Sequence, residues 1–273
     1  MTPAPMFSLT GKAIVVTGGG KGIGRGIADA MARCGARVAI HGRDAAALEA
    51  TAAALRKRGA EVLVVAGDIT RADDRDRLIE ATLTRFGAID GFVNNAGSAS
   101  PSDIGPLADI DQGQWDRVVD LNLKAAFFAA QAAARAMTRG GSIVNISSRS
   151  ASYPNPGTGH YGAAKAALEN LTRTMAAEWG HRGIRVNAVA PGVVMTEELA
   201  KTLNTAGRIR RQVETVPLQR LGTPDDIGPA CAYLVSDEAA WTSGTVIAVN
   251  GGSFVPMGYL GYLRQVNHPA RAG

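Results

Sequence analysis

Apolar and polar positions along the chain follow two alternating patterns. Short runs that are apolar at nearly every position predict buried strands at residues 13–17, 37–41, 62–66, 91–94, 142–146, 185–190 and 245–249. Longer segments with helical periodicity predict helices at residues 22–33, 45–58, 71–86, 112–137, 160–179 and 224–235. Thr70 and Thr223 stand where helix caps are expected. The pattern therefore predicts an α/β fold: a single doubly wound Rossmann-type domain, with a parallel seven-stranded sheet and helices on both faces.

The alternation contains no internal repeat and no low-complexity linker, so we expect one domain over residues 1–273. Two segments interrupt the alternation of strands and helices. Residues 192–220 form a long insertion between a strand and a helix, which we expect to act as a substrate lid. Residues 253–273 form a C-terminal tail whose first half is too apolar to remain in water. This tail is expected to cover the pocket or to pack against another subunit.

Composition narrows the class of protein. Hydrophobic residues make up 46% and charged residues 19% of the chain, as in folded soluble proteins. The net charge of +5 would suit nucleic-acid binding, but the arginines are scattered and no basic stripe interleaves with aromatic residues. The most apolar stretch, residues 125–137, is broken by Gln131 and Arg135 and is too short to span a bilayer. We therefore expect neither a nucleic-acid partner nor a membrane partner.

The cysteines and histidines argue against a disulfide-stabilised protein and against a metal site. Cys34 and Cys231 cannot build a disulfide framework, and the first nine residues do not resemble a signal peptide, so a cytoplasmic location is expected. The histidines show no metal-ligand spacing, and no metal site is expected. His160 is interpreted as a polar residue at the start of a helix.

A glycine-rich segment, residues 17–24, follows the first predicted strand and opens the first helix. Glycines let the backbone turn sharply and approach a pyrophosphate, and the N-terminus of the helix offers free N–H groups and a favourable dipole. The residues of this loop expected to bind a dinucleotide are Gly18, Lys21, Gly22, Ile23 and Gly24.

The end of the second predicted strand bears on the choice of dinucleotide. NAD-specific sites usually carry a carboxylate there, which binds the ribose 2′-hydroxyl. Gly42 stands at that position, and Arg43 follows it. Arg43 and Lys21 can pair with a 2′-phosphate, while Asp44 is interpreted as the N-cap of the next helix. The charges favour NADP(H) over NAD(H).

Tyr161 and Lys165 are four residues apart and therefore lie on one face of a predicted helix. A neighbouring ammonium group lowers the pKa of a phenol and makes it a better acid–base catalyst. Ser148, thirteen residues before Tyr161, could hold a substrate carbonyl oxygen, although Ser147 and Ser150 are rivals. Asn122 lies within a predicted helix, where asparagine is mildly unfavourable, and is either a surface residue or the holder of a bound water.

Taken together, these motifs resemble the short-chain dehydrogenase/reductase family over roughly residues 9–252. The matching pieces occur in the family's order: residues 17–24, residues 94–97, Asn122, Ser148 with Tyr161 and Lys165, and residues 191–192 with Thr196. One departure is mild, since the family often ends its last strand in Asp-Gly-Gly and this chain has Asn250-Gly251-Gly252.

The resemblance implies a role for each matching residue. Tyr161 would be the general acid/base, Lys165 would lower its pKa and bind the nicotinamide ribose, and Ser148 would polarise the carbonyl. Asn122 would hold a water that links Lys165 to solvent. The remaining residues would bind the cofactor: Asn95, Ala96 and Gly97 below the adenosine and ribose, Asp68 and Ile69 at the adenine, and Val194 and Thr196 at the carboxamide.

The sequence thus predicts an enzyme that transfers hydride between NADP(H) and a ketone or secondary alcohol. Two alternatives stay open: a β-ketoacyl carrier-protein reductase, for which Arg139 and Arg182 are candidate docking residues, and a non-catalytic NADP(H)-binding sensor. The arginines of the lid, at positions 208, 210, 211 and 220, either form a solvated face or bind an anionic substrate. The resemblance further implies a homotetramer.

Overall fold

The computed structural model describes residues 6–253, and its strands form one sheet of seven parallel members. The strands are β1 (Ala13–Thr17), β2 (Arg37–Gly42), β3 (Val62–Ala66), β4 (Gly91–Asn94), β5 (Gly141–Ile146), β6 (Ile184–Pro191) and β7 (Val246–Val249). They lie in the order β3-β2-β1-β4-β5-β6-β7, so the strand order reverses between β1 and β4. The predicted doubly wound Rossmann-type sheet is confirmed.

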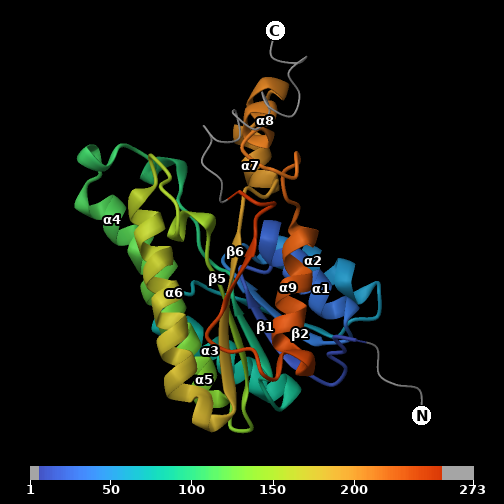
Figure 1. Cartoon of the computed structure of the whole chain (residues 1–273). Helices are drawn as coiled ribbons and strands as arrows, with labels where there is room; N and C mark the ends of the chain where they lie inside the picture. Colours follow the sequence, from blue (N-terminus) through green and yellow to red (C-terminus); the bar gives the residue numbers. More distant parts are fainter. Residues whose placement is uncertain (1–5, 254–273) are drawn as a thin grey trace.

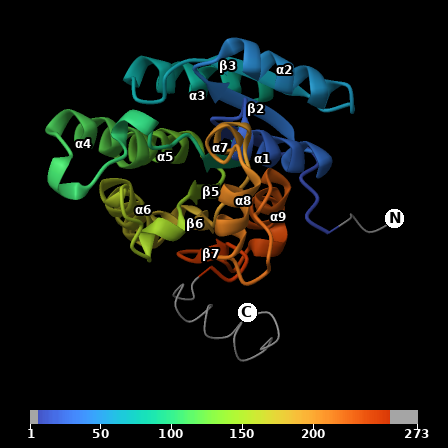
Figure 2. The same cartoon turned by 90° about the horizontal axis from the view of Figure 1, so that it is seen from above.

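Helices cover both faces of this sheet. They are α1 (Gly22–Arg33), α2 (Ala45–Arg56), α3 (Ala72–Phe86), α4 (Gln112–Val119), α5 (Ala125–Ala136), α6 (Gly159–Trp179), α7 (Glu197–Thr202), α8 (Ala206–Val213) and α9 (Pro224–Val235). Figure 2 shows α1 and α9 on one side of the sheet and α5 and α6 on the other.

The strands are apolar at successive positions because each face contacts a different helical layer. In β1, Val16 belongs to the core cluster that contains Ile27 of α1, whereas Val15 belongs to the cluster that contains Ala129 of α5. Both valines are fully buried. Successive side chains of a strand point to opposite faces, so a strand between two helical layers needs apolar residues at both its odd and its even positions.

The helix predicted over residues 112–137 is interrupted. α4 ends at Val119, the chain then makes a π-helical turn over Asp120–Lys124, and α5 begins at Ala125. The side chain of Asn122 gives the physical reason: its Nδ2 donates to the Val118 carbonyl oxygen at 2.9 Å, which is the acceptor that the Asn122 N–H would use in an α-helix. The amide thus replaces a backbone bond and opens the turn.

The prediction that Thr70 caps the helix after β3 is wrong, because the N-cap of α3 is Arg71. The Thr70 hydroxyl donates instead to Asp68 Oδ1 at 2.8 Å, and the Thr70 N–H donates to the same oxygen at 3.0 Å. Hydrogen bonds to a charged carboxylate are stronger than the neutral bond that a threonine cap makes, so Thr70 binds Asp68 and does not cap the helix. Asp44, in contrast, caps α2 as predicted, accepting from the Ala47 N–H at 3.0 Å.

The insertion at residues 192–220 contains α7 and α8 and projects beyond the C-terminal ends of the strands (Figure 1). Leu203, Val216 and Leu221 form a small apolar cluster of its own, separate from the two cores of the sheet. The tail predicted to cover the pocket or to pack against another subunit lies, from residue 254 onward, outside the described residues.

Candidate active site

The glycine-rich loop after β1 has the close backbone packing that a phosphate cradle requires. Gly18 has a φ of +66°, and a Cβ atom there would lie 2.8 Å from Asn95 Nδ2. A Cβ atom on Gly24 would overlap the Gly18 carbonyl group. Only glycine fits both positions, so the N-terminus of α1, which starts at Gly22, approaches the loop closely.

A cavity of 410 Å³, a volume typical of small-molecule sites, opens next to this loop. Many of the predicted cofactor residues line it: Gly18, Lys21, Arg43, Asp68, Ile69, Ala96 and Gly97. The cavity lies at the C-terminal ends of β1, β2, β3 and β4, where the strand order reverses. These are the place and the volume expected of an adenine-nucleotide site in a doubly wound sheet.

The other predicted cofactor residues surround the cavity without lining it. Gly22, Ile23 and Gly24 form the first turn of α1. Asn95 Nδ2 donates to the Thr17 carbonyl oxygen at 2.9 Å and thereby supports the loop from below. The Thr196 methyl carbon lies 3.1 Å from the position of a Cβ atom on Gly22, so the lid segment touches the loop.

Charged groups at the end of β2 are arranged in pairs. Lys21 Nζ lies 2.6 Å from Asp44 Oδ2, and this contact raises the pKa of Lys21 and lowers the pKa of Asp44. Both side chains are exposed. Sequence reasoning missed Glu198 of α7, which also lines the cavity, because only the fold brings the lid to the loop.

Tyr161 and Ser148 come together on the opposite side of the switch point. Burial raises the pKa of the Tyr161 hydroxyl, and side-chain hydrogen bonding with Ser148 lowers it. Lys165 Nζ lies 5.7 Å from the centre of the Tyr161 ring. The hydroxyl pair and the ammonium group predicted from the sequence are therefore neighbours in space.

Lys165 is buried, with 3% of its surface exposed, and burial lowers its pKa to about 8. Its ammonium group donates to the Ile146 carbonyl oxygen at 2.8 Å. Asn122 is fully buried, and its Nδ2 also donates to the Ser98 carbonyl oxygen at 2.7 Å. A Cβ atom on Gly97 would lie 2.6 Å from Asn122 Oδ1 and 3.1 Å from Lys165 Nζ, so this backbone passes beside both groups.

The two rival serines have other partners. Ser147 is buried, and its hydroxyl donates to Glu169 Oε1 at 2.7 Å. Ser150 donates its N–H to Ser148 Oγ at 3.1 Å, and its own hydroxyl accepts from Asn155 Nδ2 at 3.3 Å. Ser148 is thus the serine that interacts with Tyr161.

His160 is not a simple polar residue at a helix start. Its side chain is fully buried, and its ring stacks on Trp115 with centroids 6.3 Å apart. Neither ring nitrogen has a hydrogen-bond partner within residues 6–253. The imidazole therefore packs as an aromatic group between α4 and α6.

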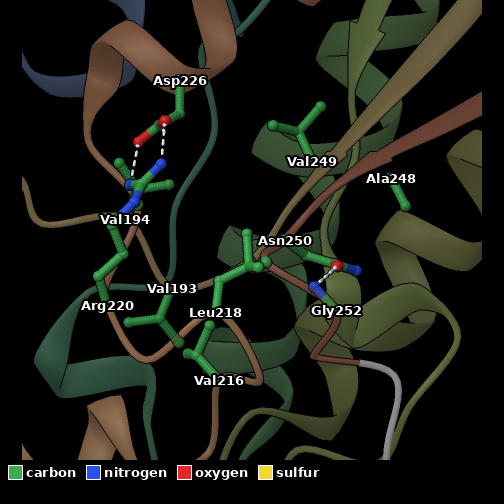
Figure 3. Close-up of a pocket in the computed structure, with 13 residues that line it drawn as sticks. Val193, Val194, Val216, Leu218, Arg220, Asp226, Ala248, Val249, Asn250 and Gly252 are labelled. Carbon is green, nitrogen blue, oxygen red and sulfur yellow. Dashed lines mark hydrogen bonds and ion pairs between the residues drawn. The ribbon is translucent and has the colours of Figure 1, made fainter.

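Two of the four lid arginines are paired with acidic residues. Arg210 pairs with Glu214 at 3.1 Å, and Arg220 makes two hydrogen bonds of 2.7 Å to Asp226. The Arg220–Asp226 pair borders a second cavity, of 340 Å³, which Val194 also lines (Figure 3). Asn250 stands on the other side of this cavity and accepts from the Gly252 N–H at 3.0 Å (Figure 3).

Residues 6–253 contain no helix that is both long and apolar enough to cross a membrane. Over the same part of the chain, no group of three or more histidine, cysteine, aspartate or glutamate side chains could hold a metal ion.

Comparison with known proteins agrees with this geometry. The sequence profile described as enoyl-(acyl carrier protein) reductase matches residues 18–253. The 2-(S)-hydroxypropyl-CoM dehydrogenase 3 of Xanthobacter autotrophicus is 39% identical over 250 residues, which cover 89% of this chain and 97% of the relative. The 3-oxoacyl-[acyl-carrier-protein] reductase of Staphylococcus epidermidis is 36% identical, with coverages of 89% and 99%.

Among solved structures, a short-chain type dehydrogenase/reductase from Mycobacterium marinum superposes with a TM-score of 0.86 at 34% identity. The superposition covers 92% of this chain and 98% of the other. With the sheet order, the glycine loop and the Ser148–Tyr161–Lys165 cluster described above, these matches show that the chain belongs to the short-chain dehydrogenase/reductase family, oxidoreductases that act on alcohols and ketones with a nicotinamide dinucleotide.

Proposed function

We propose that this protein transfers hydride between NADP(H) and a ketone or secondary alcohol, with Tyr161 as the general acid/base. The observation that carries the proposal is the hydrogen bonding of Tyr161 with Ser148, with Lys165 one helical turn away. Ser148 is only partly buried, so a substrate oxygen can reach the two hydroxyl groups. Hydroxyl donors aimed at one oxygen suit a reaction in which negative charge develops there.

Each residue has one task in this scheme. In reduction, Tyr161 gives its proton to the substrate oxygen, while Ser148 donates a hydrogen bond to that oxygen and polarises the carbonyl. Lys165 supplies positive charge that favours the phenolate left behind. Asn122 shapes the π-helical turn and holds a water that connects Lys165 to solvent. The dinucleotide supplies or accepts the hydride.

We infer a preference for NADP(H) from the charges around the adenosine cavity. Arg43 lines the cavity, and Lys21 lines it next to Asp44. Asp44 is held by Lys21 and by the N-terminus of α2, so its charge is largely compensated. A guanidinium group is well suited to a 2′-phosphate. Quenching of protein fluorescence by NADPH and NADH tests this preference directly, and equal affinities would contradict it.

For the substrate, we propose a small carbonyl compound or secondary alcohol. The β-ketoacyl carrier-protein alternative has weaker support, because both of its candidate docking residues already have partners within the chain. Arg182 donates to the Ala134 carbonyl oxygen at 2.7 Å, and Arg139 lies 3.7 Å from Asp90. An activity panel decides between the classes. It contains cyclohexanol, 2-(S)-hydroxypropyl-CoM and acetoacetyl-CoA, which represent neutral alcohols, an anionic alcohol and a β-ketoacyl thioester.

A homotetramer in the cytoplasm is the assembly and location we propose. A groove between α5 and α6 is lined by Phe127, Leu171 and Trp179, and Phe128 beside it is 39% exposed. Apolar helix faces of this kind suit a contact with a second copy of the chain. Analytical ultracentrifugation tests the assembly, and a monomer would contradict it. The free cysteines Cys34 and Cys231 suit a reducing compartment.

Tyr161→Phe is the variant that tests the reaction. It removes the proton donor and keeps the ring, so turnover should fall by orders of magnitude while the Kd for the dinucleotide stays unchanged. Turnover that survives the substitution would contradict the mechanism. A wild-type protein that binds the dinucleotide but turns over no member of the panel would favour the sensor alternative.

A further inference from the structure

The C-terminal end of β5 is joined to α6 by a series of contacts from consecutive residues. Asn145 Nδ2 donates to Thr172 Oγ1 at 2.9 Å, and the Ile146 carbonyl oxygen accepts from Lys165. The Ser147 hydroxyl donates to Glu169 Oε1 at 2.7 Å, and the next residue, Ser148, interacts with Tyr161. The proposed reaction uses the contacts of Lys165 and Ser148 and leaves the Asn145–Thr172 and Ser147–Glu169 contacts without a role.

Glu169 is an unusual residue for its position. It is 7% exposed and Ser147 is 3% exposed, so the contact is sealed from solvent. Glutamate is almost never this buried without a specific partner, because the loss of hydration must be offset. Tyr161, Lys165 and Glu169 follow one another at intervals of four residues and lie on one face of α6. Glu169 is therefore the third polar group on the helix face that carries the reaction.

Ser147 is the last residue that the sheet holds before the catalytic serine. Its N–H donates to the Val189 carbonyl oxygen of β6 at 2.7 Å. At Ser148 the chain turns into a short 3-10 helix, Arg149–Ala151. The orientation of residue 147 therefore sets the direction in which the Ser148 hydroxyl leaves the sheet.

We propose that Glu169 is a positioning residue, which fixes Ser147 and thereby holds the Ser148 hydroxyl against Tyr161. The proposal rests on the function proposed above. Glu169 touches neither substrate nor cofactor in this role, and it acts through one buried hydrogen bond. Displacements of about 1 Å at a reacting group can lower turnover by about 100-fold, so a contact that sets the path of Ser148 matters for rate.

The chain offers a matched control for a merely structural role. The Asn145–Thr172 hydrogen bond joins the same strand to the same helix, is equally buried, and lies further from Tyr161. Thr172→Val removes this hydroxyl with little change in volume. A general loosening of the β5–α6 contact would affect Thr172→Val and the Glu169 variants alike.

The test compares Glu169→Leu, Glu169→Gln, Ser147→Ala and the double variant S147A/E169L with Thr172→Val. Activity is measured with the member of the substrate panel that the wild-type enzyme turns over fastest. We expect kcat to fall by about 10- to 100-fold in Glu169→Leu and Ser147→Ala, with an unchanged Kd for the dinucleotide. Glu169→Gln should keep most of the turnover, because its amide oxygen still accepts from Ser147.

The double variant separates an effect on the position of the Ser148 hydroxyl from an effect on the stability of the protein. Replacing both partners by apolar side chains leaves no unpaired polar group, so Tm should recover relative to the single variants. We expect kcat to remain low in this variant, and the pKa of Tyr161, followed by ultraviolet difference titration against the same protein carrying Tyr161→Phe, to rise as the Ser148 contact weakens. Thr172→Val should show neither effect.

Recovery of kcat together with Tm in the double variant would overturn the proposal, as would an equal loss of kcat in Thr172→Val. These failures are distinct from failure of the proposed function. Turnover that survives Tyr161→Phe would contradict the reaction mechanism, whereas an inactive Tyr161→Phe combined with a fully active Glu169→Leu would reject the role of Glu169 alone.

Discussion

The ammonium group of Lys165 donates a hydrogen bond to the main-chain carbonyl oxygen of Ile146 at 2.8 Å, in a part of the protein that is almost completely closed to solvent. The contact ties the second turn of α6 to the last residue of β5, one residue before Ser147. It places a positive charge near Tyr161 at the expense of hydration, and burial lowers the pKa of Lys165 from 10.5 to about 8. In the mechanism proposed above, function and stability therefore compete at this residue.

Replacement of Lys165 by methionine tests that competition. The folded state disfavours the protonated amine, so at pH 7 this burial lowers the free energy of unfolding by about 3 kcal/mol, and the hydrogen bond to Ile146 offsets only part of that loss. We expect Lys165→Met to raise the free energy of unfolding by roughly 1–3 kcal/mol in urea titrations at pH 7. Turnover should fall by orders of magnitude. A variant that loses both stability and turnover would contradict this account of the burial.

Gly42→Asp should shift the preference between dinucleotides. A Cβ atom at this position would lie 3.8 Å from the nearest side-chain atom, on Leu48, so the cavity has room for the start of an aspartate side chain. A carboxylate there repels a 2′-phosphate and accepts from a 2′-hydroxyl. We expect the ratio of the Kd for NADPH to the Kd for NADH to rise by about 10-fold or more, equivalent to about 1.4 kcal/mol. Gly42→Ala is the control and should leave the ratio near the wild-type value.

Gly97→Ala should lower turnover by displacing Asn122 or Lys165, while the glycine-rich loop after β1 stays unchanged. Its Cβ atom would lie 2.6 Å from Asn122 Oδ1 and 3.1 Å from Lys165 Nζ, so one of these groups must move. Because Lys165 and Asn122 are both buried, we expect kcat to fall by about 10- to 100-fold. Gly105→Ala is the matched control, since its nearest contact would be Ile110 at 3.6 Å. Equal rates for both variants would show that this part of the site is more adaptable than its packing indicates.

His41 predicts a pH dependence of stability. It is 1% exposed, neither ring nitrogen has a partner in the described residues, and burial lowers its pKa from 6.5 to about 4. The folded protein therefore keeps this imidazole neutral while the unfolded chain binds a proton below pH 6.5. As the pH falls from 6.5 to 4, this group lowers the free energy of unfolding by up to about 1.4 kcal/mol per pH unit.

The contribution of His41 is isolated by comparing variants. Urea titrations of His41→Leu and wild type across this pH range should give a difference in free energy that grows toward low pH. The exposed His181 provides the control, and His181→Gln should follow the wild-type slope. A slope that persists unchanged in His41→Leu would assign the acid sensitivity to other groups.

The sequence by itself determined the fold class and the chemistry. A strand that is apolar at both its odd and its even positions, such as residues 13–17, is buried between two helical layers. This constraint involves only neighbouring residues, so it is visible in the sequence. The glycine loop, the Tyr161–Lys165 spacing and Ser148 are likewise short-range patterns. Their assignment to one site required only that the C-terminal ends of parallel strands share an edge.

Tertiary structure decided what depends on long-range partners. Asn122 opens a π-helical turn because its amide takes the Val118 carbonyl and reaches Ser98, a competition that helix periodicity does not reveal. Thr70 leaves the cap position because Asp68 accepts its hydroxyl. Arg220, a candidate for an anionic substrate in the sequence, is held by Asp226. Glu169 has no motif at all, and only the approach of α6 to β5 gives it Ser147 as a partner, because a hydrogen bond between distant residues exists only once both elements are packed.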